Sequence, residues 1–286
     1  MNFLVLGSSG MAGHTIALYL QEKGHKVTGF SRKKIDFIDT IIGDAKDLEL
    51  LRGIILAGKY DAIINCIGIL NQNAEKNKTD AIFLNGYLPH YLVSITEALE
   101  TKIIQMSTDC VFSGKNGNYT ENSIKDGDTF YDRTKAIGEI IDKKNITLRN
   151  SIIGPDINPN GIGLFNWFMS QKKVVKGYTK VMWTGLTTLQ LAKIIERMTM
   201  KNISGLYNMV PSYNISKYDL LKLFNYYMKE DLLEIVPFDK ISIDKTLIRT
   251  NYEFKDEVPT YEEMIFEMSE WIKKHKILYP HYDFNE

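Results

Sequence analysis

The chain has 286 residues, and its 35 Lys and Arg balance its 35 Asp and Glu, which leaves a formal net charge of zero and excludes a nucleic-acid or polybasic membrane-surface binder. With 44% hydrophobic and 24% charged residues the composition is typical of a globular protein, of one large domain or two unequal ones at roughly 150 residues per domain. Two cysteines, no metal-ligand motif, no signal-peptide pattern and no long apolar run predict a cytoplasmic protein without disulfides, metal or membrane span.

In the first half of the chain, short apolar runs alternate with helical patterns. Strands are predicted at 3–6, 26–30, 62–66, 102–106 and 146–148, and helices at 12–23, 74–99 and 130–143. Such an order is typical of βαβ units that form a parallel sheet covered on both faces. We therefore expect an α/β protein with a Rossmann-type, doubly wound parallel sheet over residues 1–155.

After residue 150 the alternation loosens. A Pro/Asn/Gly stretch at 154–161 indicates a loop, and helices at 164–171, 189–200, 217–227 and 261–274 with a strand at 206–210 complete the chain. We expect a smaller α/β substrate-binding domain over residues 156–286, with 184–212 packing back on the Rossmann sheet.

The first strand runs into a glycine-rich turn with the spacing Gly-x-x-Gly-x-x-Gly. Glycines there permit a tight turn, a close approach to a pyrophosphate and close helix packing, with the phosphates at the helix N-terminus. Because this turn follows the first strand and opens a βαβ unit, it predicts dinucleotide binding rather than a merely tight turn. The expected contact residues are Gly7, Ser9, Gly10, Met11 and Gly13.

The second predicted strand ends at Ser31 and Arg32, followed by Lys33 and Lys34. NAD enzymes usually place an acidic residue here for the ribose hydroxyls, whereas a serine and cations suit a 2′-phosphate. The run therefore predicts NADPH in preference to NADH, which stays an open alternative. A solvated charge run is the competing interpretation.

Candidate catalytic residues follow the predicted strand at 102–106. Thr108 stands at its carboxyl end, where ligands bind in open α/β sheets. Tyr131 and Lys135 are four residues apart in a predicted helix and so share one face. A nearby ammonium is expected to lower the pKa of the tyrosine and make it a usable general acid.

Together these segments resemble the extended short-chain dehydrogenases, specifically the dTDP-4-dehydrorhamnose reductase-like group of sugar-nucleotide reductases. The resemblance runs nearly end to end. It rests on the glycine turn, Asp44, Asn85, the run 107–109, the Tyr131/Lys135 pair, 148–151 and the tail 249–265.

The resemblance implies NADPH-dependent reduction of the C4 ketone of a nucleoside-diphosphate 4-keto-6-deoxyhexose. Tyr131 would protonate the forming alkoxide, Thr108 would hydrogen-bond the same oxygen, and Lys135 would orient the ribose. Further cofactor contacts are expected from Asp44, Cys66, Ile67, Gly68 and Asn85, and substrate contacts from Asn166, Trp183 and Arg249, although Cys66 is also expected to act as a packing residue.

The resemblance leaves several alternatives open. The preferred substrate is a UDP-2-acetamido-2,6-dideoxy-hexos-4-ulose, and the alternatives are a plain dTDP-4-dehydrorhamnose reductase and a non-catalytic, dinucleotide-binding regulatory subunit. A homodimer is compatible with each.

Cys110 suggests a second reaction. At this position the chain resembles GDP-fucose synthase, a related epimerase/reductase whose cysteine exchanges a proton next to the ketone. Epimerisation at C3, or at C3 and C5, needs a second proton carrier, and no histidine lies between Ile146 and Lys180. Lys172, Lys173 and Lys176 are the candidates, and a structural role for Cys110 is the alternative.

Overall fold

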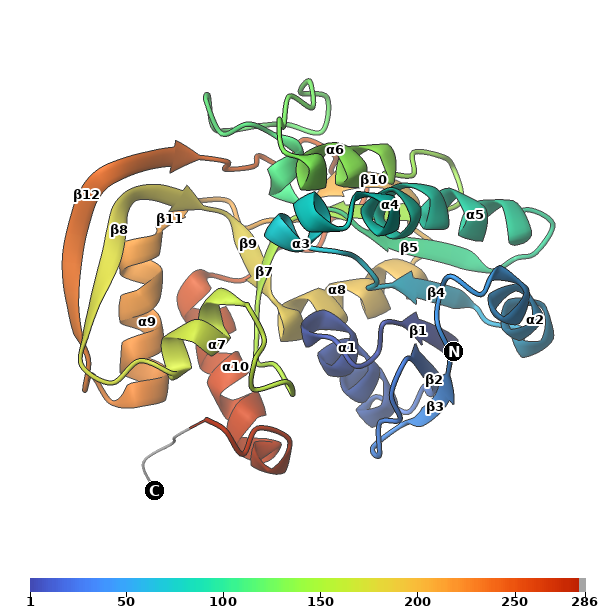
Figure 1. Cartoon of the computed structure of the whole chain (residues 1–286), viewed down its shortest axis with the longest axis horizontal. Coiled ribbons are helices and arrows are strands. Elements are labelled where there is room, and N and C mark those ends of the chain that lie inside the picture. The colour runs from blue at the N-terminus through green and yellow to red at the C-terminus, as the bar shows by residue number, and fades with distance from the viewer. Residues whose placement is uncertain (283–286) are drawn as a thin grey trace.

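A computed structural model describes residues 1–282 of the chain. Its centre is a seven-stranded sheet in the order β10-β6-β5-β4-β1-β2-β3, and every neighbouring pair in it is parallel (Figure 1). This confirms the expected Rossmann-type fold. The strands are β1 (Asn2–Leu6), β2 (Lys26–Ser31), β3 (Asp39–Ile42), β4 (Ala62–Asn65), β5 (Lys102–Met106), β6 (Ile146–Arg149) and β10 (Gly205–Asn208).

Helices cover both faces of this sheet, so its central strands are buried on both faces. In β1, Phe3 and Val5 belong to one core cluster, which includes residues of α1 (Met11–Glu22), α8 (Thr188–Met200) and α10 (Tyr261–Lys274). Leu4 and Leu6 belong to a second cluster, with residues of α2 (Leu48–Gly58) and α5 (Leu88–Ile95). A strand buried on both faces shows no alternation of apolar and polar residues.

Two predicted helices are shorter than expected. The helix expected at 74–99 is a series of short pieces: α3 (Asn71–Lys76), α4 (Lys78–Ala81), the π-helical turn η1 (Ile82–Tyr87) and α5, which ends at Ile95. The helix expected at 130–143 is α6 (Phe130–Ile137). Gly138 ends it where the Asn85 carbonyl oxygen comes so close that a Cβ on Gly138 would lie 1.9 Å away.

A smaller α/β unit stands beside the sheet, on the left in Figure 1. It contains the sheet β11-β8-β12, formed by β11 (Ile215–Ser216), β8 (Val174–Trp183) and β12 (Glu234–Asp244). A two-stranded sheet pairs β7 (Ser151–Ile153) with β9 (Gly185–Thr187). The helices of this unit are α7 (Leu164–Met169), α9 (Lys217–Lys229) and α10, and short 3-10 turns η2 (Asp109–Val111) and η3 (Lys276–Leu278) lie elsewhere in the chain.

The chain returns to the central sheet after β9. Helix α8 packs against α1, and β10 pairs with β6 at the edge of the sheet. A segment that we call the strap, residues 245–258, then crosses the molecule. Its Leu247 amide donates to Thr184 Oγ1 at 2.9 Å and its Ile248 amide to the Tyr119 carbonyl at 2.8 Å. Within residues 1–282 no helix is long and apolar enough to cross a membrane.

Candidate active site

The glycine turn is shaped by contacts that exclude side chains. Gly7 has φ +78°, in the left-handed region that favours glycine, and its carbonyl accepts from the Gly10 amide at 3.0 Å. A Cβ on Gly13 would lie 2.2 Å from the same carbonyl oxygen. Gly10 begins α1 without a side-chain cap, so no cap side chain bonds the first amides of that helix. A backbone cradle at a helix N-terminus fits the pyrophosphate of a dinucleotide.

The end of β4 lies directly behind this turn. A Cβ on Gly7 would lie 3.1 Å from the Ile67 side chain and 3.2 Å from the Cys66 carbonyl, so the predicted cofactor residues of the two strands come together. Burial raises the pKa of the Cys66 thiol to about 12, as expected for a packing residue.

Asn85 holds the next part of the same loop. Its Oδ1 accepts from the Ile69 amide at 2.8 Å, and its Nδ2 donates to the Ile69 carbonyl at 2.9 Å and to Thr134 Oγ1 at 3.1 Å. A Cβ on Gly68 would lie 3.2 Å from Asn85 Oδ1. The amide group of Asn85 therefore joins the loop after β4 to helix α6.

The polar run after β2 divides into a buried and an exposed part. Ser31 is buried, and its hydroxyl donates to the Lys33 carbonyl, so that hydroxyl already has an acceptor within the loop. Arg32, Lys33 and Lys34 are exposed. Asp44 is exposed as well and accepts from the Lys46 amide at 3.0 Å. Among residues 31–34, the exposed side chains are therefore the three cations.

The predicted catalytic hydroxyls meet above β5. Tyr131 lies in the first turn of α6, which is fixed by a capping box between Thr129 and Asp132. Burial of the ring raises the pKa of Tyr131 above its ordinary value and outweighs the nearby Thr108 side chain, which acts to lower it. The structure thus brings Thr108 and Tyr131 together.

The expected lowering of the Tyr131 pKa by Lys135 is not found. Lys135 Nζ instead donates to the Met106 carbonyl at 2.6 Å, and burial lowers the pKa of this ammonium to about 8. The charged neighbours that act on Tyr131 are Cys110, Asp109 and Asp132, which all raise its pKa. Desolvation and nearby acids, which residue spacing does not reveal, decide the direction.

Cys110 lies beside this pair, partly buried. Its amide donates to Thr108 Oγ1 at 3.1 Å. Burial, and then the charge of Asp109, raise the pKa of the thiol to about 12, so the thiol is a much weaker acid than a free cysteine. The lysine whose charge acts on it is Lys245 of the strap.

The predicted lysine partners of Cys110 belong to the smaller unit and are exposed. Lys172 and Lys173 lie in the loop before β8, and Lys176, in that strand, places its ammonium 5.3 Å from the centre of the Phe238 ring. The sequence offered no reason to consider Lys245.

Sequence reasoning also missed a buried ion pair next to β5. Arg149 is almost completely buried, and its Nε and Nη2 bond the two carboxylate oxygens of Glu139 at 2.9 and 2.8 Å. Glu139 Oε1 also accepts from Ser107 Oγ at 2.6 Å. A charged residue inside the apolar strand β6 was the signal, because such a charge must have a partner.

Three of the predicted substrate residues, Asn166, Trp183 and Arg249, each have partners within the fold. Trp183 is 5% exposed and packs against Tyr261 with ring centres 5.5 Å apart, so it does not present its ring to a ligand. Asn166 is also buried, and its Nδ2 donates to the carbonyls of Pro159 and Gly161 at 3.2 and 2.7 Å. Asn166 thus shapes the loop that precedes α7.

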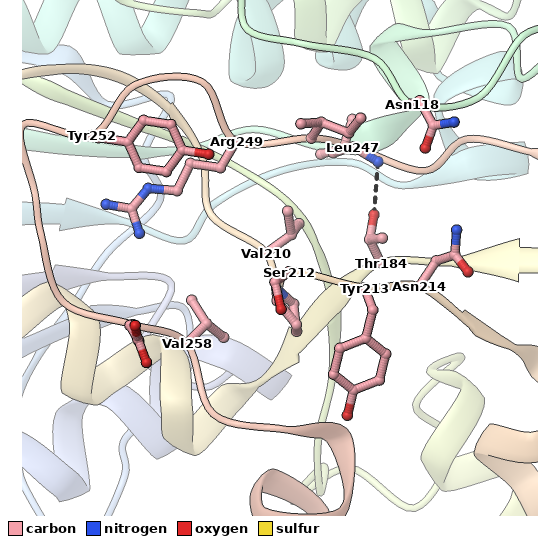
Figure 2. A pocket seen from close by; sticks show the side chains of 13 residues that line it. Asn118, Thr184, Val210, Ser212, Tyr213, Asn214, Leu247, Arg249, Tyr252 and Val258 are labelled. Carbon is pink, nitrogen blue, oxygen red and sulfur yellow. Dashed lines mark hydrogen bonds between the residues drawn. The ribbon is translucent and has the colours of Figure 1, made fainter.

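Arg249 lines a cavity of about 420 Å³ under the strap (Figure 2). Its Nε and Nη1 donate to the carbonyls of Asn251 and Asp256, each at 3.0 Å, so the guanidinium holds the strap itself. The lining includes Tyr213, Tyr252 and Thr184 but none of the predicted catalytic or cofactor residues.

The parallel sheet, the glycine turn and the tyrosine above β5 define an α/β protein of the Rossmann type. Residues 1–153 match the model of the family described as the RmlD substrate binding domain. The chain belongs to this family.

Two curated relatives are each similar over about half of the chain. One is a dTDP-4-dehydrorhamnose reductase from Streptomyces griseus, 31% identical over 139 residues, which are 48% of this chain and 43% of that protein. The other is a dTDP-4-keto-6-deoxy-D-glucose reductase from Streptomyces niveus, 25% identical over 48% of this chain and 46% of that protein. The matches thus span less than half the length of these relatives.

Solved structures are similar over nearly the whole chain. A dTDP-4-dehydrorhamnose reductase from Bacillus anthracis, in complex with NADP, has a TM-score of 0.79 at 16% identity and covers 96% of this chain and 99% of its own. A dTDP-4-dehydrorhamnose reductase from Clostridium acetobutylicum has a TM-score of 0.76 at 19% identity, covering 96% and 100%. At such identities the likeness shows the fold.

Proposed function

We propose that the protein is an NADPH-dependent reductase of the C4 ketone of a nucleoside-diphosphate 4-keto-6-deoxy sugar. The observation that carries the proposal is the arrangement at the carboxyl end of β5: Lys135 bonds the Met106 carbonyl, and Cys110, whose amide bonds Thr108, packs against the cluster that contains Tyr131. The same chain has a glycine turn that fits a pyrophosphate. Membership of the family and the names of both curated relatives support this reaction class.

Each catalytic residue has a role that its surroundings permit. Bound NADPH would supply the hydride. Tyr131, whose raised pKa keeps its hydroxyl protonated at neutral pH, would donate a proton to the C4 oxygen, and Thr108 would hydrogen-bond the same oxygen. Lys135, fixed to the Met106 carbonyl, would orient the ribose by hydrogen bonding.

For the cofactor, we propose NADPH before NADH. Gly7, Ser9, Gly10, Met11 and Gly13 would hold the pyrophosphate. The exposed Arg32 and its lysine neighbours would bind the 2′-phosphate, because the acidic residue typical of NAD sites is missing from this run. Residues 66–68 and Asp44 would complete the site, and Asn85 would hold the loop after β4 in place.

A finer proposal concerns substrate and stereochemistry. We retain a UDP-linked 2-acetamido-2,6-dideoxy sugar as the preferred substrate and a dTDP-linked sugar as the alternative. Proton exchange at C3 or C5 by Cys110 is supported by its place beside Thr108 and Tyr131 and opposed by the thiol pKa of about 12. At that pKa the thiol would act as a proton donor more readily than as a base.

The division of labour along the chain is also a proposal. Residues 1–155 would bind the cofactor and 156–286 mainly the substrate, with 184–212 belonging structurally to the central sheet through α8 and β10. A homodimer stays a prediction.

The test uses freshly prepared UDP- and dTDP-linked 4-keto-6-deoxy sugars with NADPH, with the product identified by NMR. We expect one of them to be reduced at C4. Tyr131→Phe should lower kcat by about 100-fold or more, since it removes the proton donor. Near-full activity of Tyr131→Phe would refute the assigned mechanism, and NADPH binding without turnover of either sugar would favour a regulatory subunit.

A further inference from the structure

The buried carboxylate of Glu139 has no role in the reaction as proposed so far. It lies just past the end of α6, and its side chain is fully buried. Oε1 accepts from Ser107 Oγ at 2.6 Å and from Arg149 Nε at 2.9 Å. Oε2 accepts from Arg149 Nη2 at 2.8 Å and from Lys125 Nζ at 3.1 Å. Donors from three separate segments therefore converge on one carboxylate.

Two bonds made by α6 and the residues just after it hold Met106, the last residue of β5, and Ser107, which follows it. Lys135 Nζ donates to the carbonyl of Met106, and Glu139 accepts from the hydroxyl of Ser107. Met106 and Ser107 immediately precede Thr108 in the chain. Because Tyr131 belongs to the same helix as Lys135, these bonds set the position of Thr108 relative to Tyr131.

Glu139 also acts on the charge of Lys135. Burial lowers the pKa of Lys135 to about 8, while the carboxylate of Glu139 and the thiol of Cys66 are the titratable groups that act to raise it. Glu139 is itself held ionised, because Arg149, Ser107 and Lys125 lower its pKa against the effect of burial. A permanent negative charge therefore supports a cation that burial would otherwise neutralise.

We infer that Glu139 is a positioning residue, which holds the end of β5 so that Thr108 faces Tyr131 and sets a buried carboxylate near the Lys135 ammonium. Its catalytic consequence rests on the proposed reductase function. Its electrostatic consequence does not, because the charge on Lys135 can be measured without turnover.

The first experiment compares the pH dependence of kcat/KM in three variants. Glu139→Gln keeps the size of the side chain but removes the charge and leaves one acceptor oxygen in place of two. We expect the alkaline limb to move down by about one pH unit, the effect of one close charge. Ser107→Ala is the matched control, since it removes a hydrogen bond and keeps the charge, and it should lower kcat without moving the limb.

Lys125→Met provides a variant that folds more safely, because the Lys125 side chain is about one third exposed. Without this cation, the negative charge of Glu139 acts more strongly on Lys135. The alkaline limb of kcat/KM should therefore move to higher pH. An alkaline limb that stays in place in Glu139→Gln, or falls in Lys125→Met, would overturn the inference.

The second experiment follows the Lys135 signal by NMR in protein labelled with ¹³C-lysine, with the assignment taken from the signal lost in Lys135→Arg. The pKa of Lys135 should fall in Glu139→Gln and stay unchanged in Ser107→Ala. An unchanged pKa in Glu139→Gln rejects the role of Glu139 whatever the enzyme turns over. A lowered pKa in a protein that reduces neither sugar nucleotide leaves the role of Glu139 standing and rejects only the proposed function.

Discussion

Two glycine-to-alanine substitutions are expected to change stability in opposite directions. In Gly13→Ala the new Cβ would lie 2.2 Å from the Gly7 carbonyl oxygen, whereas side-chain Cβ contacts below 3.0 Å essentially never occur, so α1 and the turn must separate by about 0.8 Å. In Gly53→Ala the new Cβ has nothing within 4 Å and stands inside helix α2.

The expected magnitudes follow from these surroundings. Overpacking in Gly13→Ala should lower the free energy of unfolding by about 1 to 3 kcal/mol. In a chain of this size, this change lowers Tm by about 2 to 5 °C. Gly53→Ala should gain about 0.5 to 1 kcal/mol from the better helix propensity of alanine, which raises Tm by about 1 to 2 °C.

Calorimetry of both variants, with and without NADPH, measures the two effects. The stabilisation by NADPH should shrink in Gly13→Ala, because the displaced turn no longer fits the pyrophosphate, and should persist in Gly53→Ala. This account of the turn would be refuted if Gly13→Ala had the Tm of the wild type and if NADPH raised the Tm of both proteins equally.

Four further outcomes are expected. Arg32→Asp should raise the KM for NADPH more than that for NADH, and equal use of both cofactors by the wild type would contradict the assignment. In D₂O the wild type should incorporate deuterium at C3 or C5 of the product and Cys110→Ser should not, while still reducing the ketone; no incorporation by the wild type would indicate a plain reductase. Asn85→Leu should destabilise the fold by about 1 to 2 kcal/mol, because partly buried backbone groups of Ile69 lose their partners, as chemical denaturation would show. Burial lowers the pKa of His14 to about 4, so the folded state holds this histidine neutral. The folded state therefore gains about 3 kcal/mol in the free energy of unfolding above pH 6.5, and this gain is lost as the pH falls to 4. In His14→Gln the urea midpoint should depend less on pH over that range.

The parts of the fold that could be predicted are those with strong local patterns. Helix α10 begins at Tyr261 and ends at Lys274 as expected, because its capping box and apolar spacing agree. Strand β3 and helix α2 were not predicted. Neither buries a full face: β3 has no fully buried residue, and α2 fully buries only Leu51 and Ile55.

Strand β12 was missed for a similar reason. It is an edge strand with mostly exposed side chains and a proline, Pro237, so it carries no apolar alternation. What forms it is pairing with β8, a partner distant in sequence.

The candidate site divides in the same way. Glycine spacing and the order Thr108, Tyr131, Lys135 are visible in the sequence, because the backbone geometry of a turn or a helix is local. The direction in which the Tyr131 pKa moves, and the burial of Trp183, depend on what the rest of the chain places around them. Glu139 escaped notice because its partners come from other segments.

The pairing of β10 with β6 has a consequence for how the protein is made. While the chain emerges from the ribosome, β6 is complete long before β10 exists, so its outer edge stays unpaired and open to other strands. Arg149 then also lacks Asn208, whose Oδ1 accepts from Arg149 Nη1 at 3.3 Å in the finished fold. A fragment that stops at residue 153, where the family match ends, would keep this open edge permanently, and we expect it to aggregate rather than fold alone.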